Sequence, residues 1–200
     1  ENGAGKSTIM KVLAGVNTNY SGKVLLKGKE IVCSSIEEQR RRGVSIVFQE
    51  MNLLPNISVA ENIFLGRQPR KKSGTIDWNL MNQSARKLLD SINSTISEKE
   101  NLSSLSVGEM QMVEIAKAIS FDSDILILDE PTSALTKREV DSLFSLIEQL
   151  KSQGMAIIYI SHRLEEIMRI GDRITILRDG ENVTTLNIKD TDIDEIIKLM

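Results

Sequence analysis

Four short apolar segments constrain the fold of this 200-residue chain more than any other feature of its sequence. They read VSIVF (44–48), DILILD (124–129), MAIIYI (155–160) and RITILR (173–178), and all are rich in β-branched residues. Most of them are separated by segments with a helical spacing of apolar residues, an alternation typical of parallel strands buried on both faces. The sequence therefore predicts an α/β layered fold whose parallel sheet contains these segments.

The composition is that of a soluble folded chain, with 40% apolar and 26% charged residues. The net charge of −3 gives no electrostatic signature of a nucleic-acid-binding protein, and the basic stretch of Arg67, Arg70, Lys71 and Lys72 has the pattern of a solvated loop. Cys33 is the only cysteine, which excludes an internal disulfide and favours a cytosolic setting. Because no apolar run approaches the roughly 20 residues that span a bilayer, any role at a membrane depends on a partner.

Residues 55–104 differ in character from the rest of the chain. Their apolar residues recur at helical spacing in VAENIFLG (59–66) and WNLMNQSARKLLDSI (78–92), and no strong strand pattern is found between them. We expect these residues to form a helical subdomain inserted into a core of residues 1–54 and 105–200. Within that core, the patterns predict a helix over 6–14, two short strands around Gly28 and a charged helix within 35–43.

The chain begins with ENGAGKST, which matches most of a phosphate-binding loop. The pattern GxxxxGK[ST] joins a strand to a helix, and Gly5, Lys6 and Ser7 supply its last three fixed positions. Backbone N–H groups of such a loop, together with the positive end of the helix dipole, bind phosphate oxygens. The first glycine of the pattern would precede Glu1, so we expect the chain to be a fragment that binds ATP poorly by itself and exposes an apolar slot beside the DILILD strand.

Two adjacent carboxylates end the apolar segment ILILDE (125–130). The carboxyl ends of parallel strands form the edge at which α/β proteins bind ligands. Together with a phosphate loop, this pair predicts nucleotide hydrolysis: Ser7 and Asp129 would hold Mg²⁺, and Lys6 would reach the β and γ phosphates. Glu130 is expected to orient and deprotonate the attacking water.

Two further polar residues follow predicted strands. Gln49 comes after VSIVF, and His162, the only histidine, comes after MAIIYI. In a parallel sheet their side chains would emerge at the same edge as Asp129 and Glu130. We therefore expect these residues to form one site with the phosphate loop.

The segment LSVGEMQMVEIAKAI starts a helix at residue 106. Ser106 and Glu109 have the spacing of a capping box ahead of apolar positions at helical intervals. The same helix N-terminus, with Ser106 and Gly108, is also a candidate anion site.

In this order, these motifs resemble the nucleotide-binding domain of the ABC transporter family. The resemblance covers essentially the whole chain: ENGAGKST is similar to the Walker A loop, Gln49 to the Q-loop, LSVGE to the signature, ILILDE to Walker B, SALT (133–136) to the D-loop and His162 to the switch histidine. Finer features, among them AENIFLGR, GTIDW and YISHRLEEI, resemble importers of the ribose and galactose type. The likeness implies a P-loop NTPase core of RecA-like type.

The resemblance also implies roles for individual residues. Contacts to ATP would come from Asn2, Gly3, Ala4, Gly5, Lys6, Ser7, Thr8 and Gln49, and from Ser106 and Gly108 across a head-to-tail pair of domains. The metal would be held by Ser7, Gln49 and Asp129, and the catalytic residues would be Glu130 and His162. The implied partners are membrane permease subunits, a second nucleotide-binding domain in the same longer polypeptide and, indirectly, a sugar-binding protein outside the cell membrane; the domain itself would act at the cytoplasmic face.

Three positions depart from the usual family pattern. Val107 and Glu109 stand where the signature usually has Gly and Gln, and Thr136 stands where the D-loop often has Asp. A carboxylate at Glu109 would repel a partner's phosphates unless the side chain turns back to cap its own helix.

Three other functions remain as alternatives. The fold could belong to a soluble ABC-type ATPase that acts on ribosomes or nucleic acid, although the GTIDW and SALT segments favour the importer. It could belong to a regulatory module that binds nucleotide without hydrolysis, although Lys6, Ser7, Asp129, Glu130 and His162 are all present. A plain α/β domain with a helical insertion would explain the apolar strands but not the polar residues at their ends.

Overall fold

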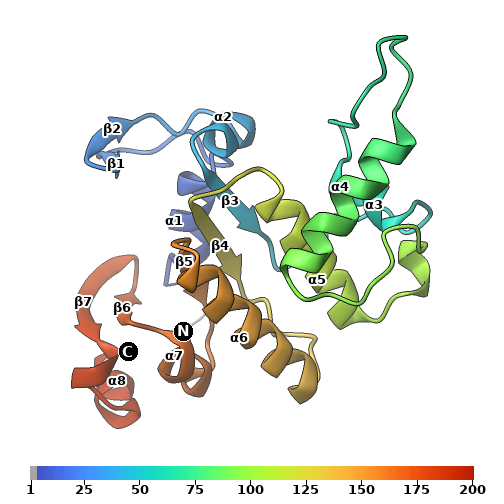
Figure 1. Ribbon diagram of the computed structural model, residues 1–200. Helices are drawn as coiled ribbons and strands as arrows, with labels where there is room; N and C mark the ends of the chain where they lie inside the picture. Colours follow the sequence, from blue (N-terminus) through green and yellow to red (C-terminus); the bar gives the residue numbers. More distant parts are fainter. Residues whose placement is uncertain (1–3) are drawn as a thin grey trace.

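A three-stranded parallel sheet lies at the centre of the computed structural model, which describes residues 4–200 (Figure 1). Strands β3 (Val44–Val47), β4 (Ile125–Asp129) and β5 (Ala156–Ile160) are adjacent in the order β3-β4-β5. The chain returns between them through helices, as parallel pairing requires. The predicted α/β class is confirmed, whereas the interpretation of Asn2 and Gly3 lies outside the described residues.

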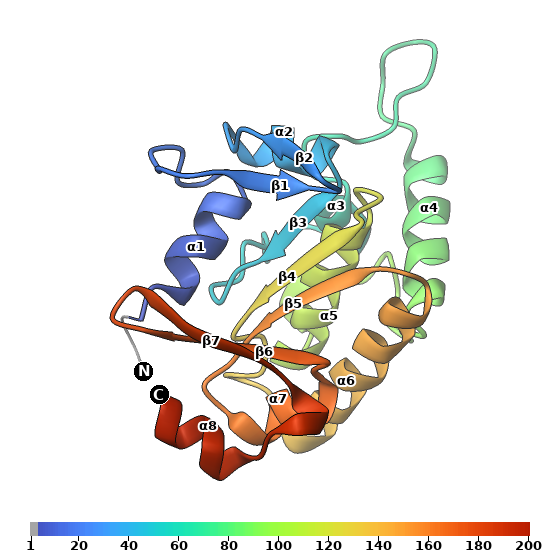
Figure 2. The ribbon, with the colours of Figure 1, turned by 90° about the vertical axis from the view of Figure 1, so that its left-hand side faces the viewer.

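Helices cover both faces of this sheet. Helix α1 (Lys6–Leu13) lies on one face, and helices α5 (Val107–Ile119) and α6 (Lys137–Ser152) lie on the other (Figure 2). Side chains of β4 alternate accordingly: Leu126 and Leu128 join the core cluster of α5 and α6, whereas Ile127 joins the cluster of α1. All three are 0% exposed, which explains why this strand reads as a continuous apolar run.

The expected apolar slot beside the DILILD strand is absent from residues 4–200. Strand β4 is paired along both edges, with Leu128 opposite Val47 of β3 and Tyr159 of β5. Among the described residues the outer edge of β5 has no strand partner, and Ile157 and Ile158 on that strand are only half-buried. The unpaired edge of β5 is therefore one strand away from the predicted position.

The prediction that RITILR belongs to the parallel sheet is wrong. Strand β6 (Arg173–Arg178) pairs antiparallel with β7 (Glu181–Asn187) in a separate two-stranded sheet. Ile174 and Ile176 are buried against helices α7 (Leu164–Ile170) and α8 (Ile193–Leu199) and the short helix η2 (Ile188–Asp190), and Thr175 between them is exposed. A strand buried on one face alternates in this way, and such strands form antiparallel hairpins.

A small hairpin precedes the sheet, as the sequence predicts. Strands β1 (Val24–Leu26) and β2 (Lys29–Ile31) flank Lys27 and Gly28, both of which have positive φ angles (51° and 76°), as in the tight turns that match strand twist. Helix α2 (Ile36–Arg41) follows, capped by Ser35.

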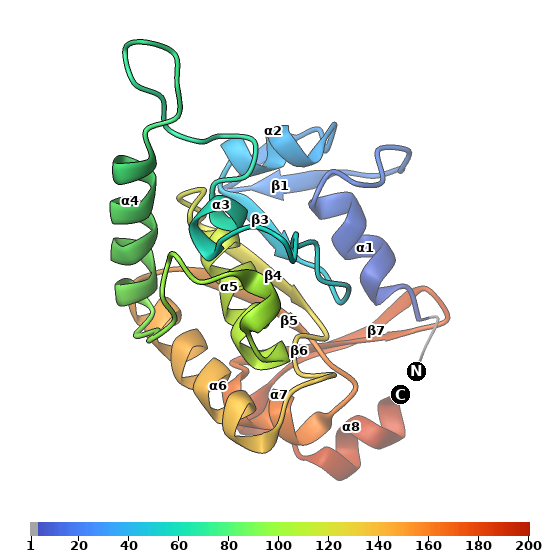
Figure 3. The same ribbon diagram turned by 90° about the vertical axis from the view of Figure 1, so that its right-hand side faces the viewer.

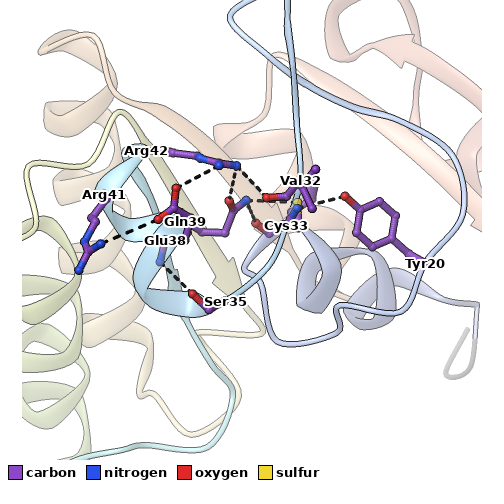
Figure 4. Close-up of polar contacts among 9 residues, drawn as sticks. Tyr20, Val32, Cys33, Ser35, Glu38, Gln39, Arg41 and Arg42 are labelled. Atoms are coloured by element: carbon purple, nitrogen blue, oxygen red, sulfur yellow. Dashed lines mark hydrogen bonds and ion pairs between the residues drawn. The ribbon is translucent and has the colours of Figure 1, made fainter.

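A buried amide joins the hairpin region to both neighbouring helices (Figure 4). Gln39 of α2, 1% exposed, donates through Nε2 to the carbonyl of Leu13 (2.7 Å) and to Sγ of Cys33 (3.2 Å). Nη1 of Arg42 donates to the carbonyl of Val32 (2.7 Å), and the backbone N–H of Cys33 donates to the hydroxyl of Tyr20 (3.1 Å). These bonds attach the end of α1 to the rest of the core.

Residues 55–104 contain helix α3 (Val59–Ile63), helix α4 (Trp78–Ser91) and the short helix η1 (Leu102–Ser104). They stand to one side of the sheet, and the loop before α4 projects from the molecule (Figure 3). Their apolar residues share one continuous cluster with α5 and β4, in which Ile63, Met81 and Leu89 are 0% exposed. The division of the chain into this subdomain and a core stays a prediction.

Candidate functional site

The N-terminus of α1 lies at the edge where the parallel strands end (Figure 2). Gly5, the N-cap residue, has a φ of 89°, in the left-handed region that favours glycine, and makes no side-chain hydrogen bond to the first turn. Lys6 and Ser7 are half-buried, Thr8 is exposed and Ala4 is buried. The backbone N–H groups of this helix end therefore lie beside the strand ends.

Ser7 and Asp129 are in contact. The hydroxyl of Ser7 donates to Oδ1 of Asp129 at 3.3 Å, although 122 positions separate the two residues in the sequence. Asp129 is 6% exposed, and burial raises the pKa of its carboxyl; the Ser7 hydrogen bond opposes this shift, the charge of Glu130 adds to it, and Lys11 and Lys6 oppose it. A buried carboxylate in this setting favours a nearby cation.

The two residues at the ends of β4 and β5 also meet. Nδ1 of His162 lies 3.4 Å from Oε1 of Glu130, whose side chain is 18% exposed while that of His162 is 58% exposed. Glu130 has a φ of 48°, a conformation that costs a non-glycine residue about 1 to 3 kcal/mol. Its backbone N–H donates to the carbonyl of Ile160 at 3.0 Å, so the sheet pairing continues to the residue that carries the carboxylate.

Gln49 lies two residues beyond the end of β3 and is exposed. Because Val47 is opposite Leu128 in the sheet, Gln49 emerges at the same edge as Asp129. The structure thus assembles Lys6, Ser7, Gln49 and both carboxylates around one sheet edge.

Ser106 and Gly108 belong to a different surface, at the N-terminus of α5. Glu109 turns back to its own helix, where Oε2 accepts from the backbone N–H of Ser106 at 2.8 Å, so the predicted capping box is confirmed. The carboxylate of Glu109 is therefore held by its own helix, as required if an anion is to approach this end.

Glu139 covers that helix end, a contact that no local sequence pattern indicates. Glu139 lies in the first turn of α6 and accepts through Oε2 from the backbone and hydroxyl of Thr136, each at 2.8 Å. Its Oε1 also accepts from the hydroxyl of Ser106 at 3.4 Å, and the backbone N–H of Gly108 donates to the same carboxylate. These bonds, led by those from Thr136, lower the pKa of Glu139.

Any side chain at position 108 would collide with this carboxylate. A Cβ added to Gly108 would overlap the Oε1 end of the Glu139 side chain, so the glycine allows this carboxylate to lie against the helix end. Thr136 is the N-cap of α6 and holds the Glu139 carboxylate in place. Through Glu139, the start of α6 is thereby joined to the start of α5.

The donors at the sheet edge fit a small divalent cation bound together with phosphate. Ser7 and Asp129 offer a hydroxyl and a carboxylate oxygen 3.3 Å apart, and Mg²⁺ is usually held by one or two such oxygens plus substrate phosphates and water. Among residues 4–200 there is no cluster of three or more histidine, cysteine or acidic side chains able to hold a metal by themselves.

No helix in the described part of the chain is long and apolar enough to cross a membrane.

Known proteins resemble the chain over its whole length. A family model described as ABC transporter matches residues 1–133. Two curated proteins named ribose import ATP-binding protein RbsA align over 201 residues and 100% of this chain: that of Chromobacterium violaceum is 48% identical and that of Geobacillus kaustophilus is 47% identical. The chain spans 40% and 41%, respectively, of the length of these relatives.

A solved structure supports the fold. The crystal structure of a nucleotide-free ATP-binding cassette from an ABC transporter superposes with a TM-score of 0.85 and 23% identity, covering 100% of this chain and 84% of that one. With the family model matching most of the sequence, the chain belongs to the ABC transporter family.

Proposed function

We propose that this chain is an ATP-hydrolysing unit that powers the import of a monosaccharide as part of an ABC transporter. The observation that carries the proposal is the meeting of Ser7 with Asp129 and of Glu130 with His162 at one sheet edge. The names of the two relatives, both ribose import proteins, support a pentose or a similar monosaccharide as the cargo.

In this proposal the start of α1 binds the phosphates of ATP. The backbone N–H groups after Gly5 and the positive end of the helix dipole favour an anion there. Lys6, the first residue of the helix, would add a positive charge at the β and γ phosphates. Asn2, Gly3, Ala4 and Thr8 would complete the loop.

Ser7, Gln49 and Asp129 would hold Mg²⁺. The ion, when bound with ATP, neutralises the negative charge that develops on the phosphates. The 3.3 Å contact between Ser7 and Asp129 supports their joint role, and the exposed amide of Gln49 lies at the same edge, within the region where the phosphates would bind.

Glu130 and His162 would perform the chemistry. A water oxygen attacks the γ phosphorus, the bond to the bridging oxygen of ADP breaks, and Glu130 takes the proton that the water loses. His162, 3.4 Å from Glu130, would contact the γ-phosphate and keep the attacking water oriented. The products are ADP and inorganic phosphate.

Ser106 and Gly108 would act on a second copy of the domain. They lie at the N-terminus of α5, where backbone donors suit the γ-phosphate held by Lys6 of the other domain. The second domain would belong to the same longer polypeptide, and permease subunits would dock against the helical region of residues 55–104 at the cytoplasmic face. A sugar-binding protein would deliver the cargo to the permease.

A soluble ABC-type ATPase acting on ribosomes or nucleic acid is the second candidate. The net charge of −3 and the import function in the names of both relatives favour the transporter instead.

Mg²⁺-dependent ATPase activity of the complete protein tests the proposal. We expect Lys6→Ala to reduce hydrolysis to background, and Lys29→Ala, an exposed residue of β2, to leave it unchanged. In vesicles that contain the permease, the sugar-binding protein and ribose should stimulate hydrolysis. A normal rate in Lys6→Ala would overturn the assigned site, and stimulation by ribosomes or nucleic acid alone would favour the second candidate.

A further inference from the structure

The carboxylate of Glu166 is buried and fully engaged. Glu166 lies on α7 and is 7% exposed. Its Oε2 accepts from the hydroxyls of Tyr159 (2.8 Å), Thr132 (2.9 Å) and Ser161 (3.0 Å), and its Oε1 accepts from Nη1 of Arg163 (3.3 Å). A buried carboxylate is costly unless such donors surround it, so this arrangement is specific to an acidic residue.

These donors come from the two segments that carry Glu130 and His162. Thr132, 2% exposed, follows Glu130 by two residues, and Ser161 directly precedes His162. A single oxygen of Glu166 therefore joins the segment after β4 to the segment after β5. It does so just beyond the backbone bond between Glu130 and Ile160, where the sheet no longer holds the two segments together.

The hydroxyl of Ser161 also fixes the turn into α7. It accepts from the backbone N–H of Arg163 at 2.9 Å while it donates to Glu166. His162 lies between these two residues, so its backbone is restrained on both sides although its side chain is exposed. Burial, followed by the hydrogen bond to Glu166, raises the pKa of Tyr159, which keeps this tyrosine a hydroxyl donor.

We propose that Glu166 is a positioning residue that sets the geometry of Glu130 and His162 for hydrolysis. The inference rests on the proposed ATPase function. The hydrogen bonds of the Glu166 carboxylate within residues 4–200 lead to β5 and to the segments after β4 and β5, and not to the N-terminus of α1, so it acts on the hydrolysis step and not on the phosphate contacts of α1.

The test is steady-state ATPase kinetics of the complete protein carrying Glu166→Gln. The amide keeps the shape but replaces one acceptor oxygen with a donor nitrogen. We expect kcat to fall by about 10- to 100-fold, the range that a misplacement of about 1 Å produces, while KM for ATP changes less than about twofold. Glu165→Gln, at the adjacent exposed position, is the matched control and should behave as the unaltered protein.

A double-mutant cycle separates positioning from general stability. In single-turnover measurements, Glu166→Gln should slow ATP hydrolysis far less in a His162→Ala background than in the unaltered protein, because the geometry that Glu166 sets is already lost. Equal losses in both backgrounds, or a rise in KM with kcat unchanged, would overturn the proposal. If Glu166→Gln lowers Tm so far that the protein unfolds, Tyr159→Phe, which removes one donor to Glu166, is measured in its place. The expected result is again a fall in kcat with little change in KM for ATP.

Failure of the proposed function has a different signature. If the site does not hydrolyse ATP, Lys6→Ala and Glu130→Gln will have no effect on any measured hydrolysis. If those two variants are inactive but Glu166→Gln has normal kcat, only the positioning role is wrong.

Discussion

Oε1 of Glu130 and Nδ1 of His162 lie 3.4 Å apart at the ends of two neighbouring strands. The strands are held in register up to Asp129 and Ile160, and the backbone bond from Glu130 to Ile160 extends that register to the candidate catalytic residues. The geometry of the candidate catalytic pair is thus a direct consequence of parallel pairing between β4 and β5.

The pH dependence of stability should report the burial of Asp129. Burial raises the pKa of this carboxyl above its ordinary value of 3.8, so the folded state binds the proton more tightly than the unfolded chain. The stability that this tighter proton binding adds is fully present below the pKa of Asp129 in the unfolded chain. It is lost as the pH rises through the pKa of Asp129 in the folded state. Without nucleotide or metal, Asp129→Asn should therefore raise Tm at pH 7, and this gain should shrink in acid.

Thermal unfolding of the complete protein at several pH values measures this effect. Glu181→Gln, an exposed residue of β7, serves as the control and should show no such gain. A lower Tm for Asp129→Asn at pH 7 would show that the carboxylate is stabilised, not strained, by its surroundings.

Glu139→Gln should strengthen ATP binding. The carboxylate of Glu139 accepts from Ser106 and Gly108, the same donors that the proposed function assigns to a partner's γ-phosphate, and two anions cannot share them. Removing the charge should lower KM for ATP by a factor of about 2 to 10, corresponding to about 0.4 to 1.4 kcal/mol.

Glu61→Gln is the matched control for Glu139→Gln. Glu61 completes the same kind of capping box with Ser58 at the start of α3, where its carboxylate accepts from Ser58 and not from Ser106 or Gly108. Both variants lose a capping charge, so only a decrease in KM specific to Glu139→Gln supports competition with phosphate. An equal change in both variants would attribute the effect to helix capping.

Phe121→Leu should destabilise the junction between α5 and β4. The ring of Phe121 contacts two guanidinium groups, with Cζ of Arg67 3.9 Å and Cζ of Arg40 4.3 Å from its centroid. Each cation–π contact contributes about 0.5 to 1 kcal/mol, so leucine should lower the free energy of unfolding by about 1 to 2 kcal/mol. Phe121→Tyr keeps an aromatic face and should retain most of this free energy of unfolding. Equal losses in the two variants, measured by urea unfolding, would exclude the cation–π contribution.

Local sequence patterns predicted the parts of the fold that depend on local physics. The run DILILD is buried on both faces, and Ser106 with Glu109 satisfies the donors of its own helix, so both could be inferred without tertiary information. The grouping of Asp129, Glu130 and His162 at one edge follows from parallel strands.

The errors and omissions have a different origin. RITILR alternates apolar and polar residues and is followed by Asp179 and Gly180, which together indicate an antiparallel hairpin. Its β-branched residues alone favoured a strand of the parallel sheet instead. The contact of Glu139 with Ser106 and that of Glu166 with Thr132 carry no such local signal, because these partners come from distant segments whose arrangement only the fold determines.

The most direct measurement of the central claim compares ATP binding with ATP hydrolysis in the complete protein carrying Glu130→Gln. The amide cannot accept the proton from water, so hydrolysis should fall by about 100-fold or more while Mg²⁺-dependent ATP binding persists. Glu30→Gln, an exposed residue of β2, should leave both unchanged. Hydrolysis by Glu130→Gln at the normal rate would contradict the assignment of this sheet edge as the catalytic site.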